Sequence, residues 1–177
     1  MKRKILLGLL LSICFLPNVQ SQNENPEDDA DLFNFWVGKW EATWDEGNGK
    51  LGKGFNSISR DLNGRILREN FEIVEGQSKG FKGTSISVHQ PQFKRWKQAW
   101  ADSQGGYFDF IAEYDKSNEH KIFKTKIHEK DGKKYIYRMV FKEIQTNTFI
   151  WDWEFSSDGG TTWKLQWRIN YKRVGSS

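Results

Sequence analysis

The chain has 177 residues, of which 37% are hydrophobic, 15% aromatic and 28% charged, with a single cysteine. Much of its formal net charge of +4 comes from Lys2, Arg3 and Lys4, because the first 21 residues contain no acidic side chain. Without that segment, 24 basic residues balance 23 acidic ones, which argues against a nucleic-acid partner.

Residues 1–21 have the pattern of a secretory signal peptide. The basic residues precede an apolar run from Ile5 to Leu16, and the small Ser21 offers a cleavage site. The run is too short to span a bilayer of about 30 Å. We therefore expect cleavage after Ser21 and a secreted or periplasmic protein without a membrane span. Cys14 leaves with the signal, so disulfide and thiol chemistry are excluded from the mature chain.

The rest of the chain divides into a linker and one domain. Residues 22–31, QNENPEDDAD, are polar and acidic and predict a flexible linker. Residues 32–174 are long enough for a single domain with one core.

From Phe35 onward, apolar residues alternate with polar ones, and Gly, Asn, Asp and Pro interrupt the alternation. This period of two predicts β-strands, and the only helical candidate is the short segment ADLFNFWVG before the first of them. The predicted strands cover residues 39–46, 51–60, 65–74, 80–89, 93–102, 106–115, 120–129, 133–143, 147–155 and 161–173.

Every predicted connection is short, which favours antiparallel neighbours. Many strands in one sheet must hide their edges, and an even number can close into a barrel whose first and last strands pair. We therefore predict an all-β, roughly ten-stranded antiparallel up-and-down β-barrel, with the short N-terminal helical segment as a plug at the terminal end. A two-sheet sandwich is the alternative.

The alternation also divides each strand into an inner and an outer face. The aromatic face should point inward, because burying such a side chain stabilises the fold by roughly 1.5–3 kcal/mol. The side chains predicted to point inward on the later strands are Trp96, Gln98, Trp100, Asp102, Tyr135, Tyr137, Met139, Phe141, Phe149, Trp151, Trp153, Phe155, Trp163, Leu165, Trp167 and Ile169.

Polar Glu69 shares the inward register of Leu67 and Phe71, and Gln98 and Asp102 share that of Trp100. A polar group inside a barrel costs free energy unless it is paired or solvated. These three residues therefore predict either a buried hydrogen-bond network or a wet pocket.

The two ends of the predicted barrel differ in composition. Loops after odd-numbered strands hold ten of the sixteen glycines, whereas the even-numbered turns at the terminal end hold one, Gly64. Mobile glycine-rich loops opposite a plugged end favour an open mouth. The alternative is that these glycines only provide turn geometry.

The segment FWVGKWEATW carries a family resemblance. Gly38 and Trp40 are similar to the G-x-W pattern of lipocalin-type (calycin) barrels, in which the tryptophan packs near a basic residue that ends the last strand. The resemblance implies that Arg173 takes that position. More broadly, residues 32–173 resemble domain of unknown function 1579, through FWVGKWEATW, LNGRILRENFE, GTSISVHQP, WKQAWADSQGGYFDF and TTWKLQWRINYKR. That family implies a calycin-like barrel and no particular activity.

The segment SSDGGTTW, residues 156–163, resembles the Asp box of sialidase propellers. It occurs once, between two predicted strands. Asp158 can accept hydrogen bonds from backbone N–H groups across the turn, and Trp163 can cover the base of the hairpin. We interpret the segment as a structural hairpin clamp.

Three functions remain open. The first is a barrel that binds a small apolar or aromatic molecule, lined by Trp100, Tyr137, Trp151 and Trp153 and oriented by Glu69, Gln98 and Asp102. The second is an enzyme that uses Glu69 or Asp102 as a general acid or base. The third is a packed structural or interaction module. Neither a metal nor a cofactor is predicted, because His89, His120 and His128 form no ligand set. The oligomeric state is left open.

Overall fold

The computed structural model describes residues 30–114 and 119–175. The predicted signal peptide and all but the last two residues of the predicted linker lie outside this range. The strands are β1 (Gly38–Gly47), β2 (Lys50–Asp61), β3 (Ile66–Glu75), β4 (Lys82–Gln90), β5 (Arg95–Asp102), β6 (Tyr107–Tyr114), β7 (Lys121–Lys124), β8 (His128–Lys130), β9 (Lys133–Lys142), β10 (Thr148–Ser156) and β11 (Lys164–Arg173).

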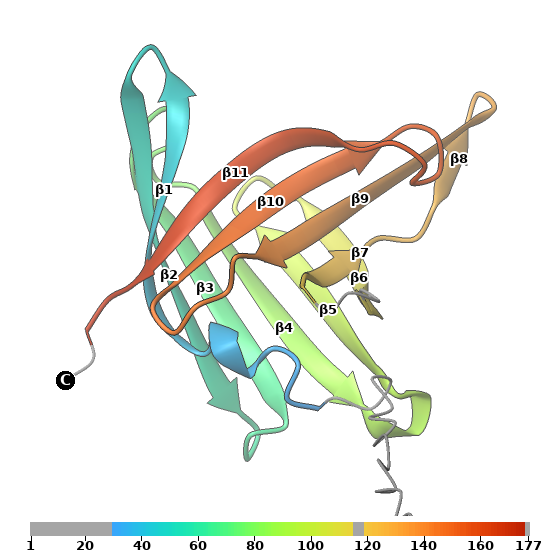
Figure 1. The fold of residues 1–177 in the computed structure, drawn as a ribbon, viewed down its shortest axis with the longest axis horizontal. Helices are drawn as coiled ribbons and strands as arrows, with labels where there is room; N and C mark the ends of the chain where they lie inside the picture. Colours follow the sequence, from blue (N-terminus) through green and yellow to red (C-terminus); the bar gives the residue numbers. More distant parts are fainter. Residues whose placement is uncertain (1–29, 115–118, 176–177) are drawn as a thin grey trace, which may run out of the picture.

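Ten of these strands close into one antiparallel barrel (Figure 1). Neighbouring strands pair in chain order from β1 to β7, then β7 pairs with β9, β9 with β10, β10 with β11, and β11 with β1. Closure satisfies the backbone hydrogen bonds that an open sheet would leave at its edges. The predicted up-and-down, ten-stranded antiparallel barrel is thus confirmed, and the additional strand β8 pairs with β9 alone.

The predicted strand at residues 120–129 is wrong in one respect, because it is two strands. The chain leaves β7 at Thr125, whose N–H donates to the Tyr137 carbonyl at 2.9 Å, and then forms β8 against the far end of β9. The first half of β6, from Tyr107 to Phe110, pairs only with β5, because β7 pairs with β6 only from Ile111 onward. The barrel wall therefore parts between β6 and β9, and His120 and His128 do not share a strand.

The helices of the described residues are two single turns of 3-10 helix, η2 (Asn34–Trp36) and η3 (Pro91–Phe93). The η2 turn lies within the segment for which the sequence predicted a short helical plug. No helix in residues 30–114 or 119–175 is long and apolar enough to cross a membrane. The η2 segment runs across the lower end of the barrel in Figure 1, beside the β2–β3 turn. Phe33 before it is fully buried and stacks on Phe123 with ring centroids 4.4 Å apart. Aromatic side chains from this segment therefore fill the terminal end.

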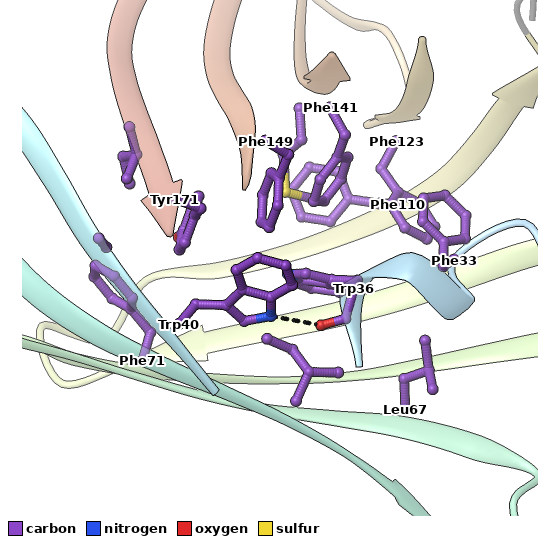
Figure 2. Close-up of a cluster of buried hydrophobic side chains, with 14 of the residues drawn as sticks. Phe33, Trp36, Trp40, Leu67, Phe71, Phe110, Phe123, Phe141, Phe149 and Tyr171 are labelled. Atoms are coloured by element: carbon purple, nitrogen blue, oxygen red, sulfur yellow. Dashed lines mark hydrogen bonds between the residues drawn. The ribbon is translucent and has the colours of Figure 1, made fainter. Parts of the chain in front are cut away.

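Buried aromatic side chains gather at this end of the core (Figure 2). Trp40 is 1% exposed and donates from Nε1 to the carbonyl of Trp36 at 2.8 Å, as the dashed line shows. Phe149 packs edge-on against Trp40 at 4.8 Å and stacks on Tyr171 at 4.5 Å. These rings join η2, β1, β10 and β11 into one cluster.

The inward prediction for Trp163 and Leu165 is wrong. Trp153 pairs with Trp167, but Glu154 pairs with Leu165, so Gln166 is an extra residue in a β-bulge. Because of this extra residue, the side chains that precede it on β11 point to the opposite side of the sheet from the one that strict alternation predicts. Leu165 is 48% exposed, and Trp163 lies outside the barrel with the Arg138 guanidinium 3.9 Å from its ring centre.

The β10–β11 loop is a hairpin clamp of the kind that the sequence predicted. Asp158 accepts hydrogen bonds from the backbone N–H groups of Thr161 and Thr162 and from the Thr162 hydroxyl. The Ser156 hydroxyl donates to Asp158 and accepts from the N–H of Gly160. These bonds, first those from the Ser156 and Thr162 side chains, hold the pKa of Asp158 well below its usual range. The loop is also tied to β9 through Gly159 N–H and the Lys134 carbonyl at 2.9 Å.

Candidate functional site

A cavity of about 190 Å³ lies inside the barrel, and we call it the aromatic cavity. Ten of its thirteen lining residues are aromatic, and one, Glu69, carries a carboxyl group. The lining residues are Trp36, Glu69, Phe71, Phe81, Trp100, Phe108, Phe110, Met139, Trp151, Trp153, Trp167, Ile169 and Tyr171.

The exposure of these rings changes along the barrel. Trp36, Phe71 and Phe110 are buried, whereas Trp100, Phe108, Trp151, Trp153 and Trp167 are only half-buried. Of the half-buried rings, Trp100 and Phe108 lie near the ends of β5 and β6 that the glycine-rich β5–β6 loop joins. Large apolar rings that remain partly accessible inside a barrel are unusual unless something covers them. The cavity is thus closed by η2 and more accessible toward the opposite end.

The rings on one wall of the cavity make both parallel and perpendicular contacts. Trp151 and Trp153 are parallel within 4°, with centroids 6.2 Å apart, and Trp167 stands at 87° to Trp151. Phe108 and Phe110 meet Trp153 edge-on at 5.4 and 6.0 Å. Edge-to-face contacts are favoured because the positive edge of one ring meets the negative face of the next, so these contacts set the orientation of the rings.

Glu69 belongs to a buried hydrogen-bond network on β2, β3, β4 and β11. Its two carboxyl oxygens accept from Asn56 Nδ2 at 2.7 Å and from Ser85 Oγ at 2.6 Å. Asn56 Nδ2 also lies 3.4 Å from the Tyr171 hydroxyl. Burial raises the pKa of Glu69 to about 7, and the two hydrogen bonds only partly oppose this effect. The carboxyl group can therefore change protonation state near neutral pH.

Burial also raises the pKa of Tyr171, and the nearby Glu69 carboxylate adds to the effect, so the phenol stays neutral. Another polar group in the cavity wall lacks a partner. The Nε1–H group of Trp36 has no hydrogen-bond acceptor in the described part of the chain, although the residue is 2% exposed. A buried unpaired donor costs roughly 1–3 kcal/mol.

The structure separates the predicted site residues. Glu69, Trp100, Trp151 and Trp153 line the aromatic cavity together. Tyr137 is instead stacked behind Trp153, with ring centroids 5.3 Å apart, and is not a lining residue.

Gln98 and Asp102 are also absent from the cavity lining. Gln98 is buried and donates to the Ser87 hydroxyl at 2.9 Å. Asp102 accepts from the N–H groups of Gln104 and Gly106 and from the Trp100 indole. Partial desolvation opposes these hydrogen bonds, but they still hold the pKa of Asp102 below its usual value. Asp102 thus closes the β5–β6 turn and orients Trp100.

Sequence reasoning missed the inner face of β4. Gly83, Ser85 and Ser87 point inward, while Ile86 is 43% exposed. The register explains this choice, because Ser85 lies opposite Trp100 and Ser87 opposite Gln98. A β-carbon on Gly83 would lie 2.0 Å from the Trp100 ring. Small residues on β4 therefore make room for the large side chains of β5, and this size complementarity was the available signal.

A larger hollow of about 730 Å³ lies on the outer face of β2–β5. Its lining includes the exposed side chains of Phe55, Ser57, Lys82 and Thr84, and Ala101. It has neither the enclosure nor the convergent buried groups of a ligand site. Among residues 30–114 and 119–175, no group of three or more His, Cys, Asp or Glu side chains could hold a metal ion.

No protein-family model matches the chain, and a search of curated proteins found no match.

Proposed function

We propose that the protein is a secreted or periplasmic binding protein that holds one small, largely apolar or aromatic molecule in the aromatic cavity. One observation carries this proposal: ten aromatic residues and one buried carboxylic acid, Glu69, surround a space of about 190 Å³. Apolar pockets with a few placed polar groups are typical of small-molecule sites. The predicted signal peptide supports the location.

The volume limits the size of the ligand. A protein cavity of about 150 Å³ lined by apolar side chains can bind benzene, whereas sites for larger ligands occupy roughly 300–1,000 Å³. A space of about 190 Å³ therefore suits one ring with short substituents.

We also propose that the chain belongs to the calycin superfamily and to domain of unknown function 1579. The support is the closed up-and-down barrel together with the G-x-W tryptophan and its basic partner. Arg173 lies over Trp40, with its guanidinium carbon 4.0 Å from the ring centre.

The binding function can be tested on the mature protein purified from its own secretory compartment. Native mass spectrometry should find an added mass that disappears on denaturation. The double variant Trp100→Ala, Trp153→Ala should lose this mass, whereas Trp163→Ala, which removes a tryptophan outside the barrel, should keep it. If the folded double variant retains the ligand, or if the protein binds no molecule of this size, the proposal is wrong.

An enzyme on the same barrel is the second candidate, and one observation favours it. A general acid or base works best with a pKa near the working pH, and burial raises the pKa of Glu69 to about 7. Asp102 does not suit the role of acid, because its pKa is lowered and it closes a turn. Turnover that is lost in Glu69→Gln and kept in Asp102→Asn would favour the enzyme.

A packed structural or interaction module is the third candidate. The observation in its favour is that the aromatic cavity is smaller than most ligand sites. A protein that carries no added mass, and whose tryptophan fluorescence does not respond to any small aromatic compound, would support this function instead.

A further inference from the structure

We propose that the ligand of the aromatic cavity carries a cationic nitrogen, as a small alkylated amine or a quaternary ammonium attached to an apolar or aromatic body. This inference rests on the proposed binding function and narrows its ligand class. It follows from two features of the cavity wall: the orientation of its rings, and a buried carboxyl group that has no cationic partner among residues 30–114 and 119–175.

The rings can attract positive charge. The face of an aromatic ring is negative, and tryptophan attracts a cation more strongly than phenylalanine or tyrosine. The cavity is lined by five tryptophans: Trp36, Trp100, Trp151, Trp153 and Trp167. Because Trp167 stands at 87° to Trp151 and is 5.9 Å from it, the wall presents ring surfaces in more than one direction. Such arrangements favour quaternary ammonium groups, which carry no N–H and need no hydrogen-bond acceptor.

Glu69 differs from the other fully buried carboxylate. Asp152 is 1% exposed and is paired with two cations, Lys142 at 2.5 Å and Arg168 at 2.7 Å. These ion pairs outweigh the cost of burial and lower the pKa of Asp152. Glu69 is 7% exposed and receives hydrogen bonds only from neutral groups on Asn56 and Ser85.

Buried charges in proteins are normally paired. Within the part of the chain that the structure describes, the groups around Glu69 are Asn56 on β2, Ser85 on β4 and Tyr171 on β11. Of these only Tyr171 titrates, and it stays neutral because burial raises its pKa. A cation in the cavity would supply the missing partner.

Binding should therefore be coupled to a proton. Without ligand, burial keeps the pKa of Glu69 at about 7, so much of the protein carries a neutral carboxyl group at that pH. A bound cation favours the carboxylate and lowers the pKa. Each binding event should release close to one proton at about pH 6 and at most about half a proton at pH 7, and a neutral ligand of the same shape should release none.

Two probes of matched shape separate charge from size. Phenyltrimethylammonium is a cation, and tert-butylbenzene is its neutral isostere; both consist of one ring with a short substituent. Titration calorimetry at about pH 8 should give the cation at least about tenfold higher affinity, which corresponds to roughly 1.4 kcal/mol. The affinity for the cation should fall about tenfold by pH 6, because protonation of a group with a pKa near 7 leaves about a tenth of it ionised.

The variant Glu69→Gln should lose the part of the preference for the cation that the carboxylate supplies, together with its dependence on pH, and keep only the part that the rings supply. The matched control Glu72→Gln changes an exposed carboxylate on the same strand, paired with Lys82 at 3.2 Å, and should keep the preference for the cation. If Glu69→Gln does not fold, proton release by the unchanged protein, measured in two buffers of different ionisation enthalpy, tests the same point.

The outcomes distinguish this inference from the proposed function. If tert-butylbenzene binds as tightly as phenyltrimethylammonium, or if the cation binds without proton release at pH 6, the cationic ligand class is wrong and the binding barrel stands. If neither probe binds, the binding function itself is contradicted. A preference for the cation that is undiminished in folded Glu69→Gln would also overturn the assignment to Glu69.

Discussion

Arg173, the last residue of β11, covers Trp40 on β1, with its guanidinium carbon 4.0 Å from the ring centre. The same guanidinium donates to the carbonyls of Val37, Phe35 and Thr146 at 2.8, 3.1 and 3.0 Å. One side chain thus joins the last strand, the first strand, the η2 segment and the β9–β10 turn. It closes the terminal end of the barrel where β11 pairs with β1.

We expect Arg173→Lys to lower the free energy of unfolding by about 1–3 kcal/mol. Lysine keeps the charge but lacks the planar guanidinium that stacks on the Trp40 ring and directs its N–H groups toward all three carbonyls, two of which are partly buried. Chemical denaturation followed by tryptophan fluorescence would measure the change. Arg95→Lys is the matched control, because Arg95 covers Phe93, whose side chain is 57% exposed. Equal losses in the two variants would contradict the closing role of Arg173.

The hairpin clamp makes a second prediction. Asp158→Ala should lower the melting temperature and loosen the β10–β11 loop, because four backbone or hydroxyl donors lose their common acceptor. It should leave ligand affinity unchanged, since Asp158 is not a lining residue of the aromatic cavity. Amide hydrogen exchange at Thr161 and Thr162 would report the loosening. Ser157→Ala, an exposed neighbour, serves as control, and a loss of ligand affinity in Asp158→Ala would contradict the purely structural role.

The alternation of apolar and polar residues was sufficient to predict the barrel, because strand period and short turns are local properties. It failed where the register changes. Nothing in the local pattern reveals that Gln166 is skipped, so Leu165 and Trp163 were predicted on the wrong face. Likewise, the break after Lys124 depends on Thr125 bonding to Tyr137, which is twelve residues away.

The candidate site was predicted in part for the same reason. The inward positions of Trp100, Trp151 and Trp153 follow from parity within one strand. The partners of Glu69 do not, because Asn56 and Ser85 reach it from neighbouring strands through pairings such as Ser85 opposite Glu69. Asp102 has inward parity as well, but the turn after β5 provides nearer donors than the cavity does.

The small residues on β4 offer a test of the cavity wall in which no lining residue is substituted. In Gly83→Ala, the added carbon would lie 2.0 Å from Cζ2 of Trp100, so the ring must move. We expect ligand affinity to fall by about tenfold, which a loss of roughly 1.4 kcal/mol of contact would produce. Lys82→Ala, an exposed neighbour on the same strand, should have no effect. Unchanged affinity in Gly83→Ala would mean that Trp100 does not contact the ligand.

Glu69 should make stability depend on pH. Its pKa is about 7 in the folded protein and about 4.5 in the unfolded chain. Below about pH 4.5 the Glu69 carboxyl group is protonated in both the folded and the unfolded protein. Between about pH 4.5 and pH 7 it loses its proton in the unfolded protein and keeps it in the folded protein. Stability must therefore fall as the pH rises from about 4.5 to about 7, by about 3 kcal/mol in total, and stay constant above.

Other carboxylates also titrate, so the test is a difference between two proteins. The free energy of unfolding of Glu69→Gln should change less between about pH 4 and pH 8 than that of the unchanged protein, because glutamine keeps the neutral shape and cannot ionise. At about pH 8 the free energy of unfolding of the unchanged protein should be lowered by the ionisation of Glu69, and at about pH 4 this lowering should be absent. A difference that is constant with pH would show that Glu69 ionises as easily in the barrel as in water, which requires that solvent reach the carboxyl group.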